Sequence, residues 1–280
     1  MKVLVTGGSG WIGQATCKAL EARGHEAIPF DRTAGNDVLD QVDVKEAVLD
    51  SDHVIHLAGL LGTHELFGNA HEAFEVNVMG SLNVTVACSD ARRGLTEITM
   101  PRVNPSLYAA TKACAMDTAL AFQEAGELEC SFVRAYNAYG PGQAYGGDHP
   151  QKILPTFASK AWAGEPIPVW GAGDLLTDLV HVDDVARMLV EAMAHGDGVC
   201  FDAGSGHAQT VRSVAEAVRT YVFDHGGPLA PIENLPPRVG ERRTSTGKDF
   251  ATGEGWDRLN GWRPVFDPER FAEAIDSYKP

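Results

Sequence analysis

The chain begins Met1-Lys-Val-Leu-Val-Thr-Gly-Gly-Ser-Gly-Trp-Ile-Gly13, and the organisation of the remaining sequence follows from this stretch. Residues 2–6 form a short run rich in β-branched side chains, which predicts a buried parallel strand. Residues 11–23 have helical periodicity and end at Gly24. The glycine-rich turn between them lets the backbone approach a pyrophosphate, and the helix N-terminus offers N–H groups and the positive end of a dipole.

The glycines and the first acidic residue after the second predicted strand specify the expected ligand. Gly7, Gly10 and Gly13 stand at three-residue intervals, and Asp31 follows about 18 residues after the last of them. An aspartate there accepts hydrogen bonds from both hydroxyls of an adenosine ribose and repels a 2′-phosphate. The neighbouring Arg32 suits a 2′-phosphate, but Asp31 is the better-placed group, so we predict NAD rather than NADP. The competing interpretation is an ordinary turn with an incidental surface aspartate.

Composition limits the classes of function. The chain has 280 residues, of which 44% are hydrophobic, enough for one large α/β unit or two closely joined domains. The formal net charge of −15 argues against nucleic acid or an anionic membrane as a partner. The five cysteines are scattered, and neither they nor the histidines have metal-ligand spacing. With no signal peptide and no membrane-length apolar run, we expect a reduced, cytoplasmic enzyme without a metal site.

Strands and helices alternate along the chain, which predicts a doubly wound parallel sheet of the Rossmann type. We expect an NAD-binding domain over residues 1–134, completed by about 178–203, and a smaller α/β substrate-binding part over 135–280. The predicted strands lie near residues 2–6, 26–30, 53–57, 95–100, 130–135, 179–182 and 199–202. The predicted helices lie near residues 11–23, 72–92, 106–125, 152–163, 183–194 and 211–223.

The chemistry is predicted at Tyr108-Ala-Ala-Thr-Lys112, whose four-residue spacing places both end residues on one helical face. A tyrosine hydroxyl titrates near 10 and is a poor base at neutral pH. A nearby ammonium, together with a positive nicotinamide ring, favours the phenolate, which can take a proton from a sugar hydroxyl. The same spacing also occurs by chance on exposed helices, so the pair gains its meaning from the preceding dinucleotide motif.

The third predicted strand ends in Leu57-Ala-Gly59, and ligands bind at the carboxyl ends of parallel strands. Small residues there would let the backbone pass close to a cofactor. An ordinary tight turn explains the same residues equally well.

Several motifs, in order along nearly the whole chain, resemble one family. They are Thr6-Gly-Gly-Ser-Gly-Trp-Ile-Gly13, Asp31, Asp37-Val38, His56-Leu-Ala-Gly59, Asn77-Val-Met-Gly80, Tyr108-Ala-Ala-Thr-Lys112, Arg134-Ala-Tyr-Asn-Ala-Tyr-Gly-Pro-Gly142, Val169-Trp-Gly-Ala-Gly173, His181-Val-Asp-Asp-Val-Ala186, Arg238-Val-Gly-Glu241 and Leu259-Asn-Gly-Trp-Arg-Pro264. The chain resembles an extended short-chain dehydrogenase/reductase of the nucleotide-sugar epimerase/dehydratase group. The set is specific for the group and less specific for one reaction within it.

The resemblance implies roles for individual residues. Tyr108 would be the general base and acid, Lys112 would bind the nicotinamide ribose, and Asp37 and Val38 would sit at the adenine. Asn137 and Arg238 would contact the substrate diphosphate. A solvated loop arginine is the alternative for Arg238. The residues implied to bind the cofactor are Gly7, Gly10, Trp11, Ile12, Gly13, Asp31, Arg32, Asp37, Val38, Leu57, Ala58, Gly59, Asn77, Tyr108 and Lys112.

Two departures from the family pattern concern the active site. The family usually has a Ser or Thr partner for the tyrosine, and here the strand is followed almost at once by the tyrosine helix. Thr99 is the candidate at the strand end, whereas Ser106 is expected to cap the helix. Family members also commonly carry an arginine where Thr177 stands, and this leaves the substrate class open.

The resemblance favours an NAD-dependent epimerase of a nucleoside-diphosphate sugar, first of all a UDP-hexose 4-epimerase. The Thr-Asp-Glu triplet of the family's 4,6-dehydratases does not occur in this sequence. A dehydratase, reductase or decarboxylase, or a catalytically impaired NAD-binding protein, are the alternatives. A homodimer through helices around residues 77–92 and 106–125 is also implied. Phe74, Val78, Leu82 and Val86 would serve that interface, or the same stripe would face the sheet.

Overall fold

The computed structural model describes residues 1–62, 65–102, 106–146, 152–237 and 244–280. The chain divides into two compact units. The first comprises residues 1–135, 182–203 and 253–263, and the second comprises residues 136–181, 204–252 and 264–280. The returning segment 253–263 is tied into the first unit by Trp256, whose indole N–H donates to the Asp202 carbonyl at 2.7 Å.

The first unit is built on a six-stranded sheet in the order β2-β1-β3-β4-β5-β9, with every pair of neighbours parallel. Its central strands are apolar and buried, as is typical of a parallel sheet covered on both faces. The strands are β1 (Lys2–Thr6), β2 (Glu26–Phe30), β3 (His53–His56), β4 (Gly94–Thr99), β5 (Cys130–Ala135) and β9 (Asp197–Ala203).

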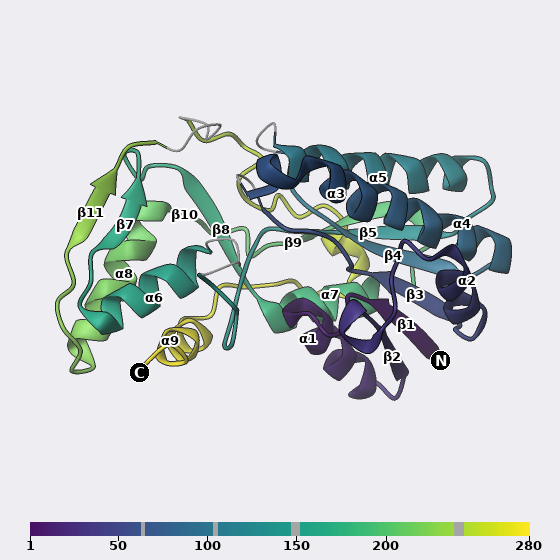
Figure 1. Ribbon diagram of the computed structural model, residues 1–280. Helices are drawn as coiled ribbons and strands as arrows, with labels where there is room; N and C mark the ends of the chain where they lie inside the picture. The colour runs from purple at the N-terminus through teal and green to yellow at the C-terminus, as the bar shows by residue number, and fades with distance from the viewer. Residues whose placement is uncertain (63–64, 103–105, 147–151, 238–243) are drawn as a thin grey trace. The chain divides into compact units, whose positions relative to one another are not determined.

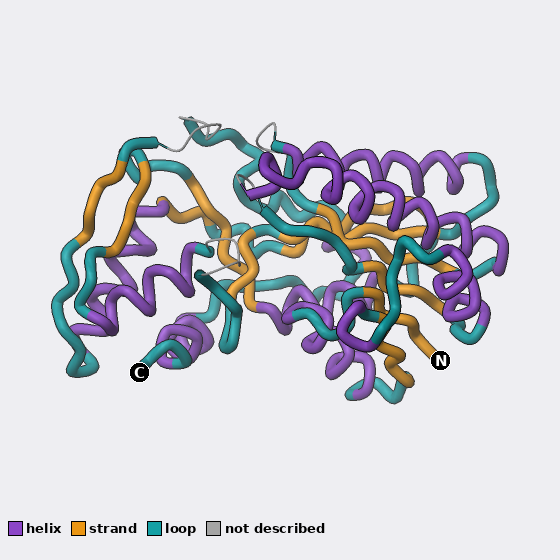
Figure 2. Tube along the Cα trace, in the orientation of Figure 1, coloured by secondary structure: helices purple, strands orange, loops and turns teal. Residues whose placement is uncertain are grey.

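Helices cover both faces of this sheet (Figure 1). On one face α1 (Trp11–Glu21) packs against α7 (Val182–Ala192). On the other face α2 (Gln41–Leu49) packs against α4 (Ser81–Ala91), and α4 packs against α5 (Leu107–Glu124). The alternation of strands and helices is visible along the trace in Figure 2. The predicted doubly wound Rossmann fold is therefore confirmed.

The strand order creates a switch point between β1 and β3. The chain leaves β1 toward β2 on one side and returns to β3 on the other. In open α/β sheets ligands bind outside the carboxyl ends of the strands at such a point. The loops after β1 and β3 are therefore the place where the fold prepares a ligand site.

The second unit contains two small sheets. In one, β6 (Asn137–Tyr139) runs parallel to β8 (Leu176–His181), and β10 (Ala208–Thr210) pairs antiparallel with β8. In the other, β7 (Ile167–Trp170) runs parallel to β11 (Ile232–Leu235). A shared apolar core joins them to the helices α6 (Ile153–Ala163), α8 (Val211–Asp224) and α9 (Pro268–Asp276).

The structure corrects the predicted elements at several points. The helix predicted near 72–92 consists of α3 (Ala70–Phe74), a π-helical turn η3 (Glu75–Gly80) and α4. The strand predicted near 179–182 begins earlier and ends before Val182, so Thr177 lies inside β8 rather than ahead of it. The sequence reading missed α2, α9, β6, β7, β10 and β11, because these elements are short.

In its described residues the first unit also contains the short 3₁₀ helices η1 (Arg32–Ala34), η2 (Glu65–Asn69) and η4 (Trp256–Arg258). Across the described ranges, no helix has the length and apolar character needed to cross a membrane. Within the same ranges, no group of three or more His, Cys, Asp or Glu side chains is arranged to hold a metal ion.

Candidate functional site

The turn after β1 needs glycine at two positions for steric reasons. Gly7 has a φ of +69°, and a Cβ there would lie 2.8 Å from the backbone nitrogen of Ala58. A Cβ on Gly13 would overlap the carbonyl oxygen of Gly7. The absence of side chains therefore brings the loop after β1 against the loop after β3, at the switch point of the sheet.

This turn delivers the chain to the N-terminus of α1, where Trp11 and Ile12 begin the helix. The Gly10 N–H donates to the Gly7 carbonyl at 3.0 Å, and Gly10 is the N-cap residue. No described side chain caps this end of α1. An uncapped helix N-terminus behind a glycine turn fits a pyrophosphate, because its first N–H groups and its dipole favour an anion.

Asp31 lies at the carboxyl end of β2, beside the glycine turn. One carboxylate oxygen accepts from the Ser9 N–H at 3.3 Å, and the other accepts from the backbone and hydroxyl of Thr33, both at 3.1 Å. Arg32 is exposed and lies 3.7 Å from both Asp37 and Glu72. A 2′-phosphate would meet two aspartates here, which agrees with the prediction of NAD rather than NADP.

Val38 lies in the core rather than at the surface. Its side chain is 5% exposed, it packs where a Cβ on Gly80 would stand, and its carbonyl accepts from Asn83 at 3.0 Å. Of the two residues predicted at the adenine, Asp37 is the more accessible, and its carboxylate accepts from the Leu39 N–H.

The loop after β3 is held from both sides. The Leu57 and Ala58 N–H groups both donate to the Thr6 hydroxyl at 3.2 Å. The Asn77 side chain accepts from the Leu60 N–H at 2.6 Å and donates to the Leu60 carbonyl at 3.0 Å. Asn77 is fully buried in the π-helical turn, so it fixes this loop.

Asn77 also connects the loop to the predicted catalytic helix. Its amide donates to the Thr111 hydroxyl at 3.1 Å, and that hydroxyl donates to the Tyr108 carbonyl at 3.0 Å. Gly59 lies next to Asn77, because a Cβ on Gly59 would be 3.0 Å from its amide oxygen. The glycine turn, the loop after β3 and the start of α5 thus form one connected site within the first unit.

Helix α5 begins as the sequence predicts. Ser106 is the N-cap residue, and its hydroxyl accepts from the Ala109 N–H at 3.1 Å. Tyr108 lies in the first turn and is partly buried, and Lys112 follows one turn later with 2% exposure. The Lys112 ammonium lies 3.5 Å from the carboxylate of Glu97 in β4.

The acidity of the Tyr108 hydroxyl reflects its surroundings in the protein without cofactor. Burial, reinforced by the negative charge of Glu97, raises the pKa of the Tyr108 hydroxyl to about 12. Loss of solvent around the phenol is the larger cause, and the carboxylate of Glu97, which lies beside Lys112, adds to it. The prediction that Lys112 together with the nicotinamide ring favours the phenolate concerns the chain with its cofactor bound and stays a prediction.

Sequence reasoning missed Glu97 and His56. A glutamate in the middle of the run from Leu95 to Thr99 was the available signal, since an unpaired carboxylate is almost never fully buried. His56 ends β3, where its ring bonds the hydroxyls of Thr6 at 2.6 Å and Ser81 at 2.8 Å. Burial, with the charge of Lys112, lowers its pKa to about 3, so the imidazole is neutral.

The other predicted residues are placed as follows. Thr99 is the buried last residue of β4, in register with Arg134 of β5. The segment 103–105 between Thr99 and Tyr108 lies outside the described residues, as does Arg238. Asn137 belongs to the second unit, where its amide donates to the Thr177 hydroxyl at 2.7 Å.

The fold and this site define a class: a Rossmann-type protein with a glycine turn, an acidic residue after β2 and a Tyr–Lys pair at the start of α5. The family model of the NAD dependent epimerase/dehydratase family matches residues 3–200, and the chain belongs to that family. NAD is accordingly its cofactor, and the predicted family resemblance is confirmed.

Individual relatives cover most of the chain. UDP-glucose 4-epimerase of Mycolicibacterium smegmatis is 27% identical over 320 residues, 100% of this chain and 99% of that protein. The 2-alkyl-3-oxoalkanoate reductase of Stenotrophomonas maltophilia is 30% identical over 292 residues, 90% of this chain and 80% of that protein. The solved structure of DesIV, a dTDP-glucose 4,6-dehydratase from Streptomyces venezuelae with NAD bound, matches with a TM-score of 0.85 at 23% identity, covering 100% and 97% of the two chains.

Proposed function

We propose that the chain is an NAD-dependent epimerase of a nucleoside-diphosphate sugar, with a UDP-hexose as the first candidate and C4 as the inverted carbon. The observation that carries the proposal is the position of Tyr108 and Lys112. They stand one turn apart at the start of α5, linked through Thr111 and Asn77 to the loop that borders the glycine turn. An acid–base pair next to a dinucleotide site is what hydride chemistry at a carbinol requires.

In the proposed mechanism Tyr108 accepts and then returns a proton. When bound, NAD supplies the acceptor and donor for a hydride at the sugar carbon. Asp31 would hold the adenosine ribose, and the N-terminus of α1 would bind the pyrophosphate. Tyr108 takes the proton of the C4 hydroxyl and returns it after the keto sugar has turned over, while Lys112 orients the nicotinamide ribose. Thr99 is the proposed second hydrogen-bond partner of the reacting oxygen.

An epimerase is favoured over a dehydratase by the sequence itself. The chain has no Thr-Asp-Glu triplet, so we assign no acid and base for the loss of water. Epimerisation needs only the proton at Tyr108 and the reversible hydride.

A reductase is the second candidate, and two observations favour it. Thr177 stands where the family commonly has an arginine, and it is bonded to Asn137, the proposed diphosphate contact. The 30% identical relative is named as a reductase of an oxoalkanoate. Net oxidation or reduction of NAD during turnover distinguishes this candidate from the epimerase, whose net redox change is zero.

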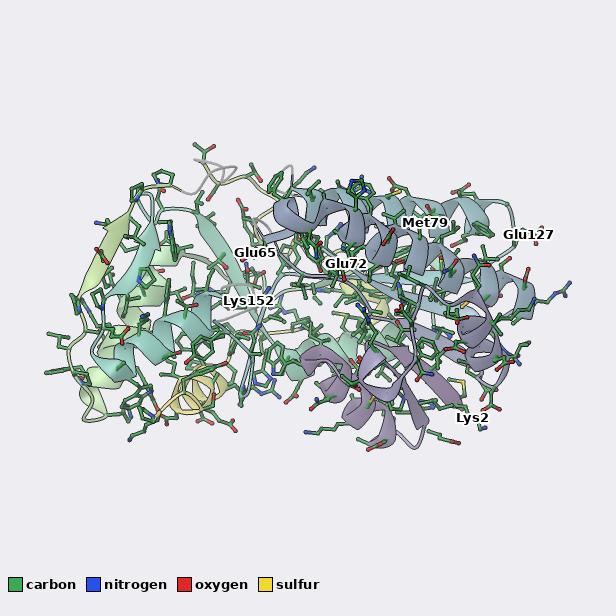
Figure 3. All side chains as sticks on the ribbon, in the orientation of Figure 1. Lys2, Glu65, Glu72, Met79, Glu127 and Lys152 are labelled. Carbon is green, nitrogen blue, oxygen red and sulfur yellow. The ribbon has the colours of Figure 1, made fainter. Side chains whose placement is uncertain are left out.

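The proposed assembly is a homodimer through the layer of η3, α4 and α5. In the predicted stripe Phe74 and Val86 are 45% and 37% exposed, and Val78 and Leu82 between them are partly buried, so the stripe is accessible at both ends. Met79 is labelled on that layer in Figure 3. An exposed apolar stripe fits a subunit interface.

The substrate-binding role of the second unit, the contact of Arg238 with the diphosphate and the cytoplasmic location remain predictions.

The test is incubation with NAD and a panel of UDP-, dTDP- and GDP-sugars, following sugar identity and the absorbance of NADH. We expect a C4 epimer from one sugar without net NADH, and no product from Tyr108→Phe. The matched control is Tyr221→Phe, since that hydroxyl bonds Asp276 within the second unit. A Tyr108→Phe variant with wild-type turnover contradicts the mechanism, and NAD binding without any product contradicts the proposed reaction.

A further inference from the structure

Glu97 is a carboxylate in the middle of a parallel sheet. It lies in β4, in register with His56 of β3 and Phe132 of β5, and its side chain is 0% exposed. Its partner is the Lys112 ammonium at 3.5 Å, and no other described residue donates to either carboxylate oxygen. A buried carboxylate persists where an opposite charge compensates it. The geometry therefore couples Glu97 to the lysine of the proposed catalytic pair.

Among the described residues, the titratable groups that interact with the pair are neutral. The titratable groups that face the pair are His56 from β3, Cys130 from β5 and Tyr108 from α5. Burial lowers the pKa of His56 to about 3, so this ring is neutral, and burial raises the pKa of the Cys130 thiol to about 12. Burial raises the pKa of Glu97, and the ammonium of Lys112 acts in the opposite direction. When the two groups share one proton, they form a cluster of zero net charge.

The balance of charge in the Glu97–Lys112 pair changes the cost of ionising the Tyr108 hydroxyl. With Lys112 alone, a phenolate would complete a neutral pair. With Glu97 present, a phenolate leaves one uncompensated negative charge in a buried cluster, which is costly. A further positive charge near the hydroxyl removes that cost, and the oxidised nicotinamide ring carries one.

We propose that Glu97 is a positioning residue that holds and neutralises Lys112, so that Tyr108 ionises only when oxidised NAD is bound. On binding, the phenol O–H bond breaks heterolytically and its proton leaves to bulk water. The phenolate then accepts the proton of the substrate hydroxyl. With reduced cofactor bound, the ring is neutral and the hydroxyl stays protonated. This inference rests on the proposed roles of Tyr108 and Lys112.

The experiment places a fluorinated tyrosine, whose phenol is intrinsically more acidic, at position 108 and follows its ¹⁹F NMR shift against pH. In the unliganded protein we expect the midpoint of Glu97→Gln to lie about one pH unit below that of the otherwise unchanged chain. In the unchanged chain NAD lowers the midpoint and NADH does not, and in Glu97→Gln the effect of NAD shrinks. Equal midpoints in the two proteins, or an equal effect of NAD and NADH, overturn the proposal.

Asp202→Asn is the matched control. Asp202 is a fully buried carboxylate of the same sheet, paired with Arg134 at 2.6 Å, and its loss should reduce stability without moving the Tyr108 midpoint. Glu97→Asp retains the carboxylate, so the titration midpoint of Tyr108 in this variant should lie close to that of the unchanged chain. An equal effect of NAD and NADH in the unchanged chain overturns the proposal even if Glu97→Gln does not fold. The titration needs no turnover, so its result is independent of whether any sugar is converted.

Discussion

At the scale of single residues, we predict that the choice between NAD and NADP depends on Asp31. Its carboxylate is anchored by Ser9 and Thr33 at the end of β2, where it can receive two ribose hydroxyls. We expect Asp31→Ala to weaken NAD binding about tenfold or more, because two hydrogen bonds to a charged acceptor are lost. Discrimination against NADP should fall as well, since the like charge is removed. Calorimetric titration with both dinucleotides measures this, with the exposed Asp90→Ala as control, and unchanged preference for NAD contradicts the assignment.

At the scale of elements, the approach of α1 to the sheet depends on Gly13. A Cβ there would overlap the Gly7 carbonyl, so the turn has to open before α1 can form in place. We expect Gly13→Ala to lower the free energy of unfolding by about 1–3 kcal/mol and to abolish NAD binding. Gly68→Ala is the control, because a Cβ at that position meets nothing within 4 Å. Urea unfolding measures the change in stability, and NAD titration measures the loss of binding. Equal stability and equal NAD binding of Gly13→Ala and Gly68→Ala would show that the turn after β1 does not require glycine at position 13.

At the scale of the whole molecule, stability should depend on two buried histidines. Burial lowers the pKa of His53 to about 4 and, with Lys112, that of His56 to about 3. The unfolded chain binds a proton at each ring near pH 6.5, so their contribution is complete above that pH and is lost as the pH falls toward 4 and 3. We expect a loss of about 1.4 kcal/mol per pH unit for each ring. Urea unfolding at pH values from 7.5 to 5 measures how steeply the free energy of unfolding falls with pH. The His53→Gln variant should have a smaller slope, and a slope identical to that of the unchanged chain refutes the assignment to His53.

The sequence alone could predict those features of the fold and site that depend on neighbouring residues in the chain. The glycine turn, Asp31 and the cap at Ser106 are local, so three-residue spacing and capping chemistry were enough to predict them. Glu97 acquires its role only because β4 and α5 bring it to Lys112, a tertiary pairing that periodicity does not encode. The burial of Val38 likewise depends on a tertiary contact, because its side chain packs on Gly80 from a different element.

Local sequence patterns also could not predict some of the short strands and helices. The strand β10 has only three residues and exists because it pairs with β8, and α2 has a weak apolar face although Asp40 caps its N-terminus. The contact between Asn137 and Thr177 in the second unit was also beyond prediction, since it depends on the pairing of β6 with β8.

The most direct test of the central claim is the fate of deuterium placed on C4 of the converted nucleotide sugar. Hydride removal and return at one carbon, with Tyr108 handling only the hydroxyl proton, predicts a C4 epimer that retains its deuterium at C4 and releases none into NADH or water. Deuterium in released NADH contradicts a closed redox cycle. Deuterium in water contradicts hydride transfer at that carbon altogether.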